Sequence, residues 1–434
     1  MNEPLNIALL GCGTVGGGVV KLLVEQRERI TARAGRTIHL KHVVVRDLCK
    51  PRPACLPKER LTADLERAIT DPAVQVVVEL IGGTGVAREA VLRALRSGKH
   101  VVTANKALLA LHGREVHEAA RDAERVIAFE ASVAGGVPII AALSQCLAAN
   151  QITSIQGILN GTSNFILTAM SEQGQTYEQA LAEAQRRGYA EADPTLDVDG
   201  SDAAHKLAIL AQLAFGVSVS PAAIDRRGIA DIDPMDVRFA NELGHRIKLL
   251  AEAWFSEGLL ALQVAPVLLR ASTPLAQIRG SANAIQVVGD VVGETLFYGL
   301  GAGEMPTASA VVADLIDLAV GRAQRTYAGL KLWALRDAGV VLRDADTVRS
   351  KFYLRLIVAD RPGVLADVCR CLADEHVSIA SVIQHEALDG DDADVVPLVI
   401  LTHSAPGGRF RAAAARMSSL PGVLGPSVWY SVAD

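Results

Sequence analysis

The chain has 434 residues, of which half are hydrophobic and 21% are charged, and its net charge at pH 7 is −5. This length suggests about three domains, and this composition excludes a wholly disordered protein. The acidic balance, without any run of Lys or Arg, argues against a nucleic-acid-binding protein.

The sequence has no features of a secreted or membrane protein. Its N-terminus leads directly into a strand-like run without a signal peptide, and no apolar run is long enough to span a membrane. The six cysteines form no CxxC pair, which favours reduced thiols over a disulfide framework. We therefore expect a cytoplasmic protein that binds neither membranes nor nucleic acids.

The first third of the chain contains a glycine-rich turn between an apolar strand at 6–10 and an apolar helical stripe at 19–23. The turn reads Gly11-Cys-Gly13-Thr14-Val15-Gly16, a G-x-G-x-x-G pattern in the required context. Gly11 permits the tight turn, Gly13 lets a pyrophosphate approach the backbone, and Gly16 lets helix and strand pack closely. The N-terminus of the helix offers free N–H groups to phosphate. This segment predicts a dinucleotide-binding site.

Further strands alternate with helical stretches, which predicts a Rossmann-type, doubly wound parallel sheet in an α/β fold. We expect these strands at residues 38–45, 74–80, 100–103 and 125–129.

The end of the second strand bears on the choice of cofactor. NAD enzymes usually place an acidic residue there for the ribose hydroxyl, whereas an arginine suits the 2′-phosphate of NADP. Arg46 comes first and Lys50 is nearby, so we favour NADP. Asp47 leaves NAD open, and Arg46 as an ordinary solvated strand end is an equal alternative.

Two further strand ends should face the ligand crevice at the carboxyl edge of the sheet. In Glu79-Leu-Ile-Gly-Gly-Thr84 the glycines let backbone approach a ligand, and Thr84 can donate a hydrogen bond. Thr103-Ala-Asn-Lys106 ends the next strand. Lys106 is therefore either a cation that faces the ligand or a surface lysine.

Two segments of small residues follow this domain. Glu130–Pro138 contains one carboxylate and could turn backbone carbonyls toward a hard cation, or it is a plain linker turn. Residues 158–165 place Thr162 or Ser163 either as the N-cap of a helix or as groups that face a substrate.

The most distinctive segment is residues 184–206, where several carboxylates precede a single lysine. Asp202 and Lys206 are four residues apart and share a face if the segment is helical. The carboxylates suit the ammonium group of an amino-acid ligand, and Lys206 suits a proton donor. The alternative is an exposed acidic loop with an ordinary ion pair worth about 0.3–0.5 kcal/mol.

Taken together, these segments resemble the homoserine dehydrogenase family over essentially the whole chain. In the 184–206 segment the resemblance rests on Ala184, Gly188, Asp193-Pro194, Asp197, Gly200, Asp202 and Lys206. The other matching blocks, in the family's order, are Glu79-Leu-Ile-Gly-Gly, Thr103-Ala-Asn-Lys106, Glu130-Ala-Ser-Val-Ala-Gly-Gly, Leu159-Asn-Gly-Thr162 and Gly301-Ala-Gly-Glu-Met-Pro-Thr-Ala-Ser309.

The family interconverts L-homoserine and L-aspartate 4-semialdehyde with NAD(P)H in threonine and methionine biosynthesis. The resemblance implies that the nicotinamide delivers hydride to the aldehyde carbon and that Lys206 protonates the developing alkoxide. Lys106 would assist at the reaction centre, and Asp202 would orient Lys206. The substrate-binding residues that the resemblance implies are Glu191 at the amino group, with Asp197, Gly161, Thr162 and Tyr189.

The resemblance also implies a site for a monovalent cation such as Na⁺, formed mainly by backbone carbonyls of Glu130, Val133, Gly135 and Val137. Glu304 departs from the family, which usually has a small residue there, and could change loop flexibility near the nicotinamide. The implied cofactor contacts are Gly11, Gly13, Thr14, Val15, Gly16, Arg46, Thr84, Thr103, Lys106 and Gly303.

The C-terminal part of the chain predicts a separate module with the order β-α-β-β-α-β. It resembles an ACT domain, which implies threonine as a feedback effector near residues 360–365; a module that only dimerises is the alternative. The expected strands are 352–358, 377–384, 395–401 and 428–431, with helices from the Asp360-Arg-Pro-Gly turn to about 375 and from about 409, and a Gly/Asp turn at 389–392.

The expected organisation is a Rossmann-type domain at 1–135 completed by residues 300–325, a central α+β substrate and dimerisation domain at 136–325, a linker at 326–349 and the ACT domain at 350–434. Family resemblance and ACT pairing suggest a homodimer or homotetramer. No fused aspartate kinase is expected, because the cofactor domain begins within ten residues of Met1.

Two other functions compete with this interpretation. A different amino-acid or aldehyde dehydrogenase on the same scaffold conflicts with the match at 184–206. A catalytically silent, NADPH-binding amino-acid sensor would need a lost catalytic residue, whereas Lys106, Asp202 and Lys206 are all present.

Overall fold

The computed structural model describes residues 3–334, 340–385 and 394–433. They form two compact units, each assembled from segments that are distant in the sequence. Unit 1 contains Met1–Gly161, Ser201–Ile224 and Ser281–Val340, and unit 2 contains Thr162–Gly200, Asp225–Gly280 and Val341–Asp434. Within the described ranges, no helix combines the length and apolarity needed to cross a membrane.

Unit 1 contains the predicted parallel sheet, with the strand order β3-β2-β1-β4-β5-β6. This is the order of a doubly wound, dinucleotide-binding sheet, in which ligands bind beyond the carboxyl ends of the strands. The predicted fold class and the predicted strands are confirmed. The strands are β1 (Leu5–Leu10), β2 (Ile38–Val44), β3 (Leu61–Thr62), β4 (Val76–Glu79), β5 (His100–Thr103) and β6 (Ile127–Ala128).

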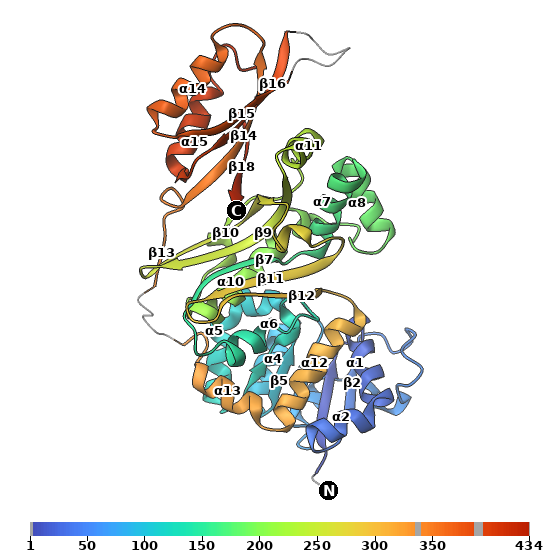
Figure 1. The fold of residues 1–434 in the computed structure, drawn as a ribbon. Coiled ribbons are helices and arrows are strands. Elements are labelled where there is room, and N and C mark those ends of the chain that lie inside the picture. Colours follow the sequence, from blue (N-terminus) through green and yellow to red (C-terminus); the bar gives the residue numbers. More distant parts are fainter. Residues whose placement is uncertain (1–2, 335–339, 386–393, 434) are drawn as a thin grey trace. The chain divides into compact units, whose positions relative to one another are not determined.

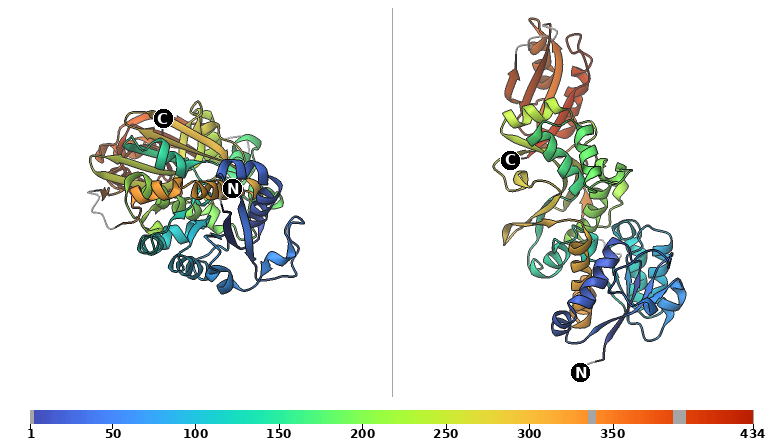
Figure 2. Two further views of the ribbon diagram at one scale, coloured as in Figure 1. Left: turned by 90° about the horizontal axis from the view of Figure 1, so that it is seen from below. Right: turned by 90° about the vertical axis from the view of Figure 1, so that its right-hand side faces the viewer.

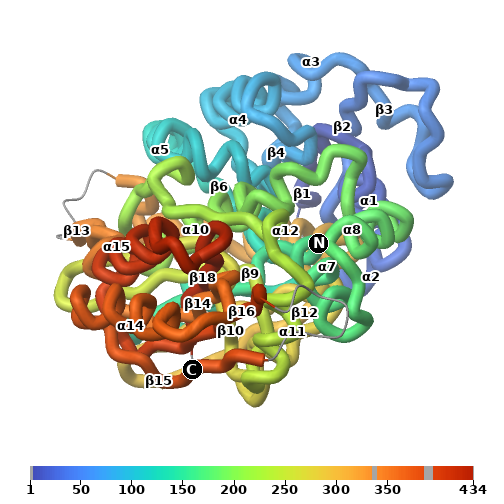
Figure 3. Tube along the Cα trace, turned by 90° about the horizontal axis from the view of Figure 1, so that it is seen from above, coloured from blue at the N-terminus to red at the C-terminus, as the bar shows by residue number. Residues whose placement is uncertain are grey.

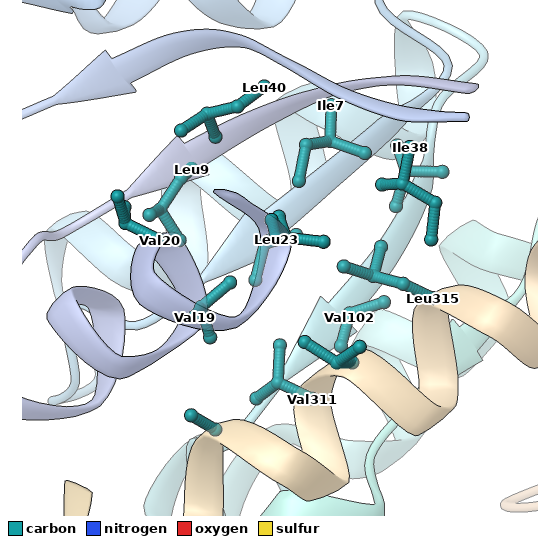
Figure 4. Close-up of a cluster of buried hydrophobic side chains, with 14 of the residues drawn as sticks. Ile7, Leu9, Val19, Val20, Leu23, Ile38, Leu40, Val102, Val311 and Leu315 are labelled. Atoms are coloured by element: carbon teal, nitrogen blue, oxygen red, sulfur yellow. The ribbon is translucent and has the colours of Figure 1, made fainter. Parts of the chain in front are cut away.

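Two helices from opposite ends of the unit 1 sequence, α1 (Thr14–Glu25) and α12 (Glu304–Ala319), pack together against this sheet (Figures 2 and 4). Figure 4 shows Val19 of α1 and Val311 of α12 in one apolar cluster with Ile7 of β1. A Cβ on Gly18 would lie 2.9 Å from the Cβ of Ala308, so the glycine permits the close approach. The remaining helices around the sheet are α2 (Arg27–Ala34), α3 (Leu65–Thr70), α4 (Val86–Arg96), α5 (Lys106–Asp122) and α13 (Arg322–Leu330).

Unit 1 also contains three antiparallel strands that pair in the order β7-β11-β12. These strands are β7 (Ile152–Ile158), β11 (Ala282–Gly289) and β12 (Gly293–Leu300), and helix α10 (Ser201–Phe215) contacts β7 and α5. The short helix α6 (Ile139–Ala141) precedes β7. Helix α5 begins at the carboxyl end of β5 in the parallel sheet, and α10 contacts both α5 and β7. The parallel strands and the antiparallel strands therefore both supply residues near the start of α10.

Unit 2 is built around a long antiparallel hairpin of β9 (His245–Ser256) and β10 (Leu259–Arg270). Strand β10 also pairs with the last strand of the chain, β18 (Val428–Ala433). The other elements of this part are α7 (Gly161–Gln173), α8 (Tyr177–Arg186), α9 (Thr195–Val198), β8 (Asp225–Arg226), α11 (Pro234–Glu242) and β13 (Val341–Leu342).

The C-terminal part of unit 2 has the predicted β-α-β-β-α-β order, with the sheet order β18-β14-β16-β15 (Figure 1). Helices α14 and α15 lie side by side on one face of this sheet, as Figures 1 and 3 show. The predicted turn at 389–392 lies outside the described residues. The elements are β14 (Arg349–Ala359), α14 (Val364–Asp374), β15 (Ile379–Gln384), β16 (Val395–Thr402), β17 (Ala405–Pro406), α15 (Gly407–Met417) and β18.

A buried ion pair attaches this C-terminal sheet to helix α11. Asp236 is completely buried and accepts two hydrogen bonds from Arg355 of β14, at 2.6 and 2.9 Å. Its carboxylate also accepts hydrogen bonds from the hydroxyls of Tyr353, at 2.8 Å, and Tyr430, at 3.4 Å. Since breaking a buried pair leaves an uncompensated charge, this contact makes the C-terminal module an integral part of unit 2.

A buried histidine on α5 contacts the segment that follows α13. His117 is 7% exposed, stacks on Trp333 with ring centroids 4.3 Å apart and donates to the carbonyl of Gly113 at 3.0 Å. A Cβ on Gly113 would lie 2.5 Å from the Trp333 ring, so the glycine makes room for the tryptophan. Burial lowers the pKa of His117 to about 4.

The depressed pKa of His117 predicts acid sensitivity in unit 1. A histidine whose pKa is lower in the folded state stabilises the fold above its unfolded pKa, and this stabilisation is lost as the pH falls from 6.5 through 4. The loss amounts to at most about 3 kcal/mol. In the variant His117→Phe, the free energy of unfolding should fall less between pH 7 and pH 5 than in the wild type. Denaturant titrations at several pH values measure this difference.

Phe129→Leu is a suitable control, because Phe129 packs edge-on against His117 but does not titrate. It should lower stability equally at each pH. If the free energy of unfolding depends on pH equally in His117→Phe and in the wild type, the lowered pKa of His117 is contradicted.

Candidate functional site

The glycine-rich turn has the geometry that its sequence predicts. Gly11 has φ of +95°, and a Cβ there would lie 2.7 Å from the carbonyl oxygen of Leu80. A Cβ on Gly16 would overlap the carbonyl of Gly11, whereas a Cβ on Gly13 would meet nothing within 4 Å. Gly11 and Gly16 therefore satisfy close packing, and Gly13 faces open space. Thr14 begins α1, so the free N–H groups of this helix lie beside that space.

Cationic side chains surround a cavity in the loop after β2. Arg46 and Asp47 are exposed, and the Asp47 carboxylate accepts from the Cys49 N–H at 2.8 Å. A cavity of about 520 Å³ is lined by residues 48–54, 56, 58 and 61, among them Lys50, Arg52 and Lys58. Arg46 is not among its lining residues. Only the cluster of basic residues and prolines after the second strand could have indicated this cavity from the sequence.

A buried carboxylate organises the neighbouring strand ends. Glu79 is 0% exposed and accepts hydrogen bonds from the N–H groups of Ile81, at 2.8 Å, and Gly82, at 2.9 Å. It also accepts from the Thr103 hydroxyl at 2.7 Å, so the side chain of Thr103 is occupied within the protein. Asn105 donates to the carbonyl of Gly83 at 2.7 Å. These contacts hold the loop that leads to Thr84 against the start of α5.

The central feature of unit 1 is a carboxylate between two lysines. Asp202 lies in the first turn of α10, and its Oδ2 is 2.7 Å from Nζ of Lys206, one turn later on the same helix. Its Oδ1 is 3.0 Å from Nζ of Lys106, the first residue of α5. The predicted helical pair of Asp202 and Lys206 is confirmed, and the structure adds Lys106 to it.

The cluster is shielded from solvent on the side of Asp202 and Lys206. Their side chains are 9% and 11% exposed, whereas that of Lys106 is 42% exposed. Burial opposes ionisation of Asp202, but the charges of Lys206 and Lys106 outweigh it and hold the pKa of this carboxyl well below its ordinary value. The carboxylate is therefore ionised at neutral pH, and the lysine pair can remain close together.

Neutral groups complete the surroundings of Lys206. Asn160 donates to Oδ2 of Asp202 at 3.0 Å. The carbonyl of Leu159 accepts from Nζ of Lys206 at 2.6 Å and from the side chain of Asn283 at 2.9 Å. Asn283 lies outside every block that resembles the family, so no sequence signal indicated it.

Most of the predicted substrate-binding residues lie in unit 2. The Thr162 hydroxyl donates to the carbonyl of Tyr189 at 2.7 Å, and the Tyr189 ring lies 5.0 Å from that of Phe165. Ser163 donates to the carbonyl of Asp197 at 2.8 Å. Thr162 and Ser163 thus lie inside α7, and the N-cap alternative for them is wrong. Glu191 is exposed in the loop between α8 and α9.

Gly161 lies at the end of the unit 1 segment that contains β7. A Cβ on Gly161 would be 2.5 Å from the carbonyl oxygen of Ser281. This close approach explains why the turn after Asn160 requires glycine.

The segment around Glu130 forms a tight turn. Ala134 and Gly135 both have positive φ, of 53° and 44°. The Glu130 carboxylate accepts from the N–H groups of Ile140, at 2.9 Å, and Ala141, at 2.8 Å. Burial raises the pKa of Glu130 to about 7. The side chain of Glu130 therefore holds the start of α6. Within the described ranges, no cluster of His, Cys, Asp or Glu suits a metal ion.

The loop before α12 is glycine-rich, and its backbone adopts a conformation that favours glycine. Gly303 has φ of +120° and precedes Glu304, the first residue of α12. Glu304 forms an ion pair of 2.7 Å with Lys21 of α1. Glu304, where a small residue was expected, therefore connects α1 with α12.

Three family models match the chain. The model described as homoserine dehydrogenase, NAD binding domain, matches residues 11–130, and that described as homoserine dehydrogenase matches residues 138–316. The model described as ACT domain matches residues 352–418.

The chain is similar to homoserine dehydrogenases of bacteria and archaea. The chain is 44% identical to a homoserine dehydrogenase of Pseudomonas aeruginosa, with 98% of each chain covered, and 45% identical to one of Neisseria gonorrhoeae, with 98% and 97% covered. A crystal structure of a homoserine dehydrogenase from Thiobacillus denitrificans has a TM-score of 0.93, 43% identity and coverage of 100% and 99%. A hyperthermophilic archaeal homoserine dehydrogenase in complex with NADPH has a TM-score of 0.62, 28% identity and coverage of 73% and 97%.

The buried carboxylate between two ammonium groups predicts strong energetic coupling. Asp202→Asn removes the anion beside buried Lys206 and should lower the free energy of unfolding by about 3–5 kcal/mol. Adding Lys206→Met should restore part of this loss, because the uncompensated buried charge is then gone. Denaturant unfolding of both single variants and the double variant measures the coupling.

Glu115→Gln is the matched control, because it breaks a half-exposed pair with Arg88. It should cost at most about 1 kcal/mol. Additive effects of Asp202→Asn and Lys206→Met would refute the coupling.

Proposed function

This chain belongs to the homoserine dehydrogenase family, and from that premise we propose that it interconverts L-aspartate 4-semialdehyde and L-homoserine with NAD(P)H in threonine and methionine biosynthesis. The observation that carries the proposal is the Lys106–Asp202–Lys206 cluster, which lies in the same unit as the glycine-rich turn. The reaction needs a hydride and a proton at one carbonyl group. The glycine-rich turn would hold the nicotinamide that gives the hydride, and the lysine cluster would supply the proton.

Lys206 is the proposed proton donor. The bound nicotinamide would supply hydride to the aldehyde carbon. An ammonium group has three N–H bonds, and within the described residues Lys206 uses two of them, for Asp202 and the Leu159 carbonyl. The third N–H is left for the substrate oxygen and transfers its proton as the alkoxide forms. Lys206 is then neutral, and proton uptake from solvent restores it.

Lys106 is the proposed electrostatic partner in this step. It lies on the other side of Asp202 and is more exposed than Lys206. A cation near the developing alkoxide stabilises the negative charge that appears in the transition state. Asp202 would hold both cations in place without itself accepting the proton.

The residues proposed to bind the amino-acid end of the substrate are Glu191, Asp197, Gly161, Thr162 and Tyr189. Glu191 is exposed and would bind the substrate ammonium group, and Asp197 would orient the substrate. Thr162 and Tyr189 are already connected by a hydrogen bond, which supports a common role in shaping this part of the site.

NADP is the proposed preferred cofactor. Three basic side chains, Lys50, Arg52 and Lys58, line the cavity beyond β2, and the Asp47 carboxylate is engaged by a backbone N–H. Cations of this kind suit a 2′-phosphate. The archaeal relative in complex with NADPH supports the same choice. Gly303 and Thr84 would approach the cofactor through the backbone and a hydroxyl.

A monovalent cation such as Na⁺ would bind the turn at Glu130–Val137 through carbonyls of Glu130, Val133, Gly135 and Val137. Two residues with positive φ support this, because such turns redirect successive carbonyl groups. A Cβ on Gly135 would lie 2.6 Å from the carbonyl of Gly301, so the ion would stabilise the turn beside the glycine-rich loop. Its proposed role is structural.

The C-terminal module is the proposed sensor for threonine. A cavity of about 340 Å³ is lined by Val358–Leu365 with Gln384 and Leu398, and Gln384 donates to the Asp360 carboxylate at 3.1 Å. This cavity lies at the turn where the resemblance places the effector. The size suits an amino acid, and the sheet to which it belongs is joined to α11 through Asp236.

A cytoplasmic homodimer or homotetramer is the proposed form of the protein. Strand β12 exposes Leu296, Tyr298 and Leu300 on one face, by 38%, 65% and 56%. Alternate apolar side chains exposed on a sheet favour association with another chain. The six cysteines are free thiols, which supports a reducing compartment.

Lys206→Ala should lower kcat by about 100- to 10,000-fold, because the proton donor is lost, while NADPH still binds. Decrease of NADPH absorbance with L-aspartate 4-semialdehyde measures turnover, and fluorescence titration measures binding. Lys41→Ala, which alters a half-buried lysine paired with Asp71, serves as the control. Near-normal turnover of Lys206→Ala would refute the assigned role, and no turnover by the wild type would refute the enzyme.

Lys50→Ala should raise KM for NADPH about tenfold, since a hydrogen bond to a charged group is lost, with little change for NADH. Arg46→Ala, measured in parallel, should also weaken NADPH more than NADH. Steady-state kinetics with both cofactors measure these effects. Equal changes for the two cofactors would remove the argument for NADP.

Asp360→Ala should abolish inhibition by threonine while leaving turnover without threonine unchanged. Point variants in the full chain are preferable to truncation, because deleting the module removes β18 from β10 and leaves Asp236 without Arg355. Threonine titrations of turnover measure the effect, with Arg416→Ala on α15 as the control. Unchanged inhibition of Asp360→Ala would exclude this cavity as the effector site.

A further inference from the structure

We propose that Asn283 of β11 is a positioning residue for Lys206, which deepens the proposed function and rests on it. Among the described residues, Asn283 forms no hydrogen bond with Asp202 or Lys206. It acts on Lys206 through the carbonyl group of Leu159, which both side chains share.

The shared carbonyl lies at the end of β7. Strand β11 pairs with β7 up to Ala284 opposite Ile158, so Asn283 is one step beyond the last pair and beside Leu159. From there its Nδ2 donates to the Leu159 oxygen at 2.9 Å, while Nζ of Lys206 donates to the same oxygen at 2.6 Å. A carbonyl oxygen has two lone pairs, and these two donors use both.

The Asn283 side chain is confined by two glycines. It occupies the place that a Cβ on Gly301 would take, because such a Cβ would overlap the Asn283 amide group. A Cβ on Gly161 would lie 3.6 Å from Oδ1 of Asn283. The amide is therefore packed between the turn that follows β7 and the loop that precedes α12, and it cannot move without moving one of them.

The polarity of Asn283 is not explained by stability. The residue is 1% exposed, and within the described part of the chain its Oδ1 has no hydrogen-bond partner. A buried acceptor without a partner costs free energy. The opposite orientation of the amide would place Oδ1 against the Leu159 oxygen, so the clash of two acceptors excludes it. An apolar side chain of the same shape would avoid the cost, and what it would lose is the hydrogen bond to Leu159.

This hydrogen bond sets the direction of the free N–H of Lys206. The three N–H bonds of an ammonium group point to the corners of a tetrahedron, so two fixed acceptors determine where the third N–H points. Asp202 is one acceptor and the Leu159 carbonyl is the other. If Asn283 no longer holds this carbonyl, the direction of the proton varies, and the cost falls on the chemical step and not on substrate binding.

The variant Asn283→Leu tests the proposal, because leucine has nearly the shape of asparagine and lacks its donor. We expect kcat for reduction of L-aspartate 4-semialdehyde to fall about 10- to 100-fold, with KM changed by less than about threefold. With NADPH deuterated at the transferred position, the isotope effect on kcat should be larger than in the wild type. The melting temperature should be equal or higher, because a buried oxygen without a partner is removed.

Two further variants keep the test decisive. Asn283→Ala removes the donor without adding any volume beside Gly301, and it should show the same selective loss of kcat if the leucine variant does not fold. Gln212→Ala is the matched control, because Gln212 on α10 is 4% exposed and its Oε1 also lacks a partner among the described residues. Its kcat should be that of the wild type.

Three results would overturn the proposal. Normal kcat in Asn283→Leu and Asn283→Ala, with an active wild type, would show that Lys206 is positioned without Asn283. A loss of kcat that parallels a lower melting temperature and disappears on cooling would show a purely structural role. No turnover by the wild type would reject the proposed function, and the inference with it.

Discussion

The structure of unit 1 depends on the placement of one carboxylate, Asp202, between two ammonium groups. Two lysines so close to one another and partly buried would repel each other without an anion between them. Asp202 forms ion pairs with both lysines, at 2.7 and 3.0 Å. Its carboxylate is almost completely buried, so water cannot take its place between the lysines. Burial alone would disfavour the carboxylate, and the lysines reverse that preference. The cluster is thus stable only as a whole, and its geometry is tightly constrained.

Three elements converge to build this cluster. The carboxyl end of β5 leads into α5 and places Lys106 at its start, and the first turn of α10 supplies Asp202 with Lys206 one turn later. The end of β7 contributes the Leu159 carbonyl. Glycines make these approaches possible: Gly161 and Gly301 lie where any side chain would collide with neighbouring groups. The same principle shapes the glycine-rich turn at 11–16, where Gly11 and Gly16 are enclosed and Gly13 is open.

Unit 2 uses a second buried carboxylate for a different purpose. Asp236 on α11 accepts from Arg355 and from two tyrosine hydroxyls, and so attaches the C-terminal sheet to the rest of the unit. Together with the pairing of β18 and β10, this contact makes the ACT module continuous with the β9–β10 hairpin. The module and the hairpin are therefore connected by backbone pairing and by a buried ion pair.

The sequence by itself determined the elements, the family and the residues of the Lys106–Asp202–Lys206 cluster. The glycine pattern at 11–16, the alternation of strands and helices, and the spacing of Asp202 and Lys206 are local signals, because turns, periodicity and an i,i+4 pair depend only on near neighbours in the chain. The β-α-β-β-α-β order of the last module follows from the same kind of signal.

Tertiary structure alone decided which groups share hydrogen bonds. No local sequence signal indicates that Thr103 donates a hydrogen bond to Glu79 or that the Glu130 carboxylate accepts from backbone N–H groups. Likewise, no local signal indicates that Asn283 and Lys206 donate to the same carbonyl. Asn283 and Leu159 are 124 residues apart, and Asp236 and Arg355 are separated by 119. A hydrogen bond requires a donor–acceptor distance that is correct to within a few tenths of an ångström, and a suitable direction. Between residues so far apart in the sequence, only the packing of whole strands and helices sets this distance and direction.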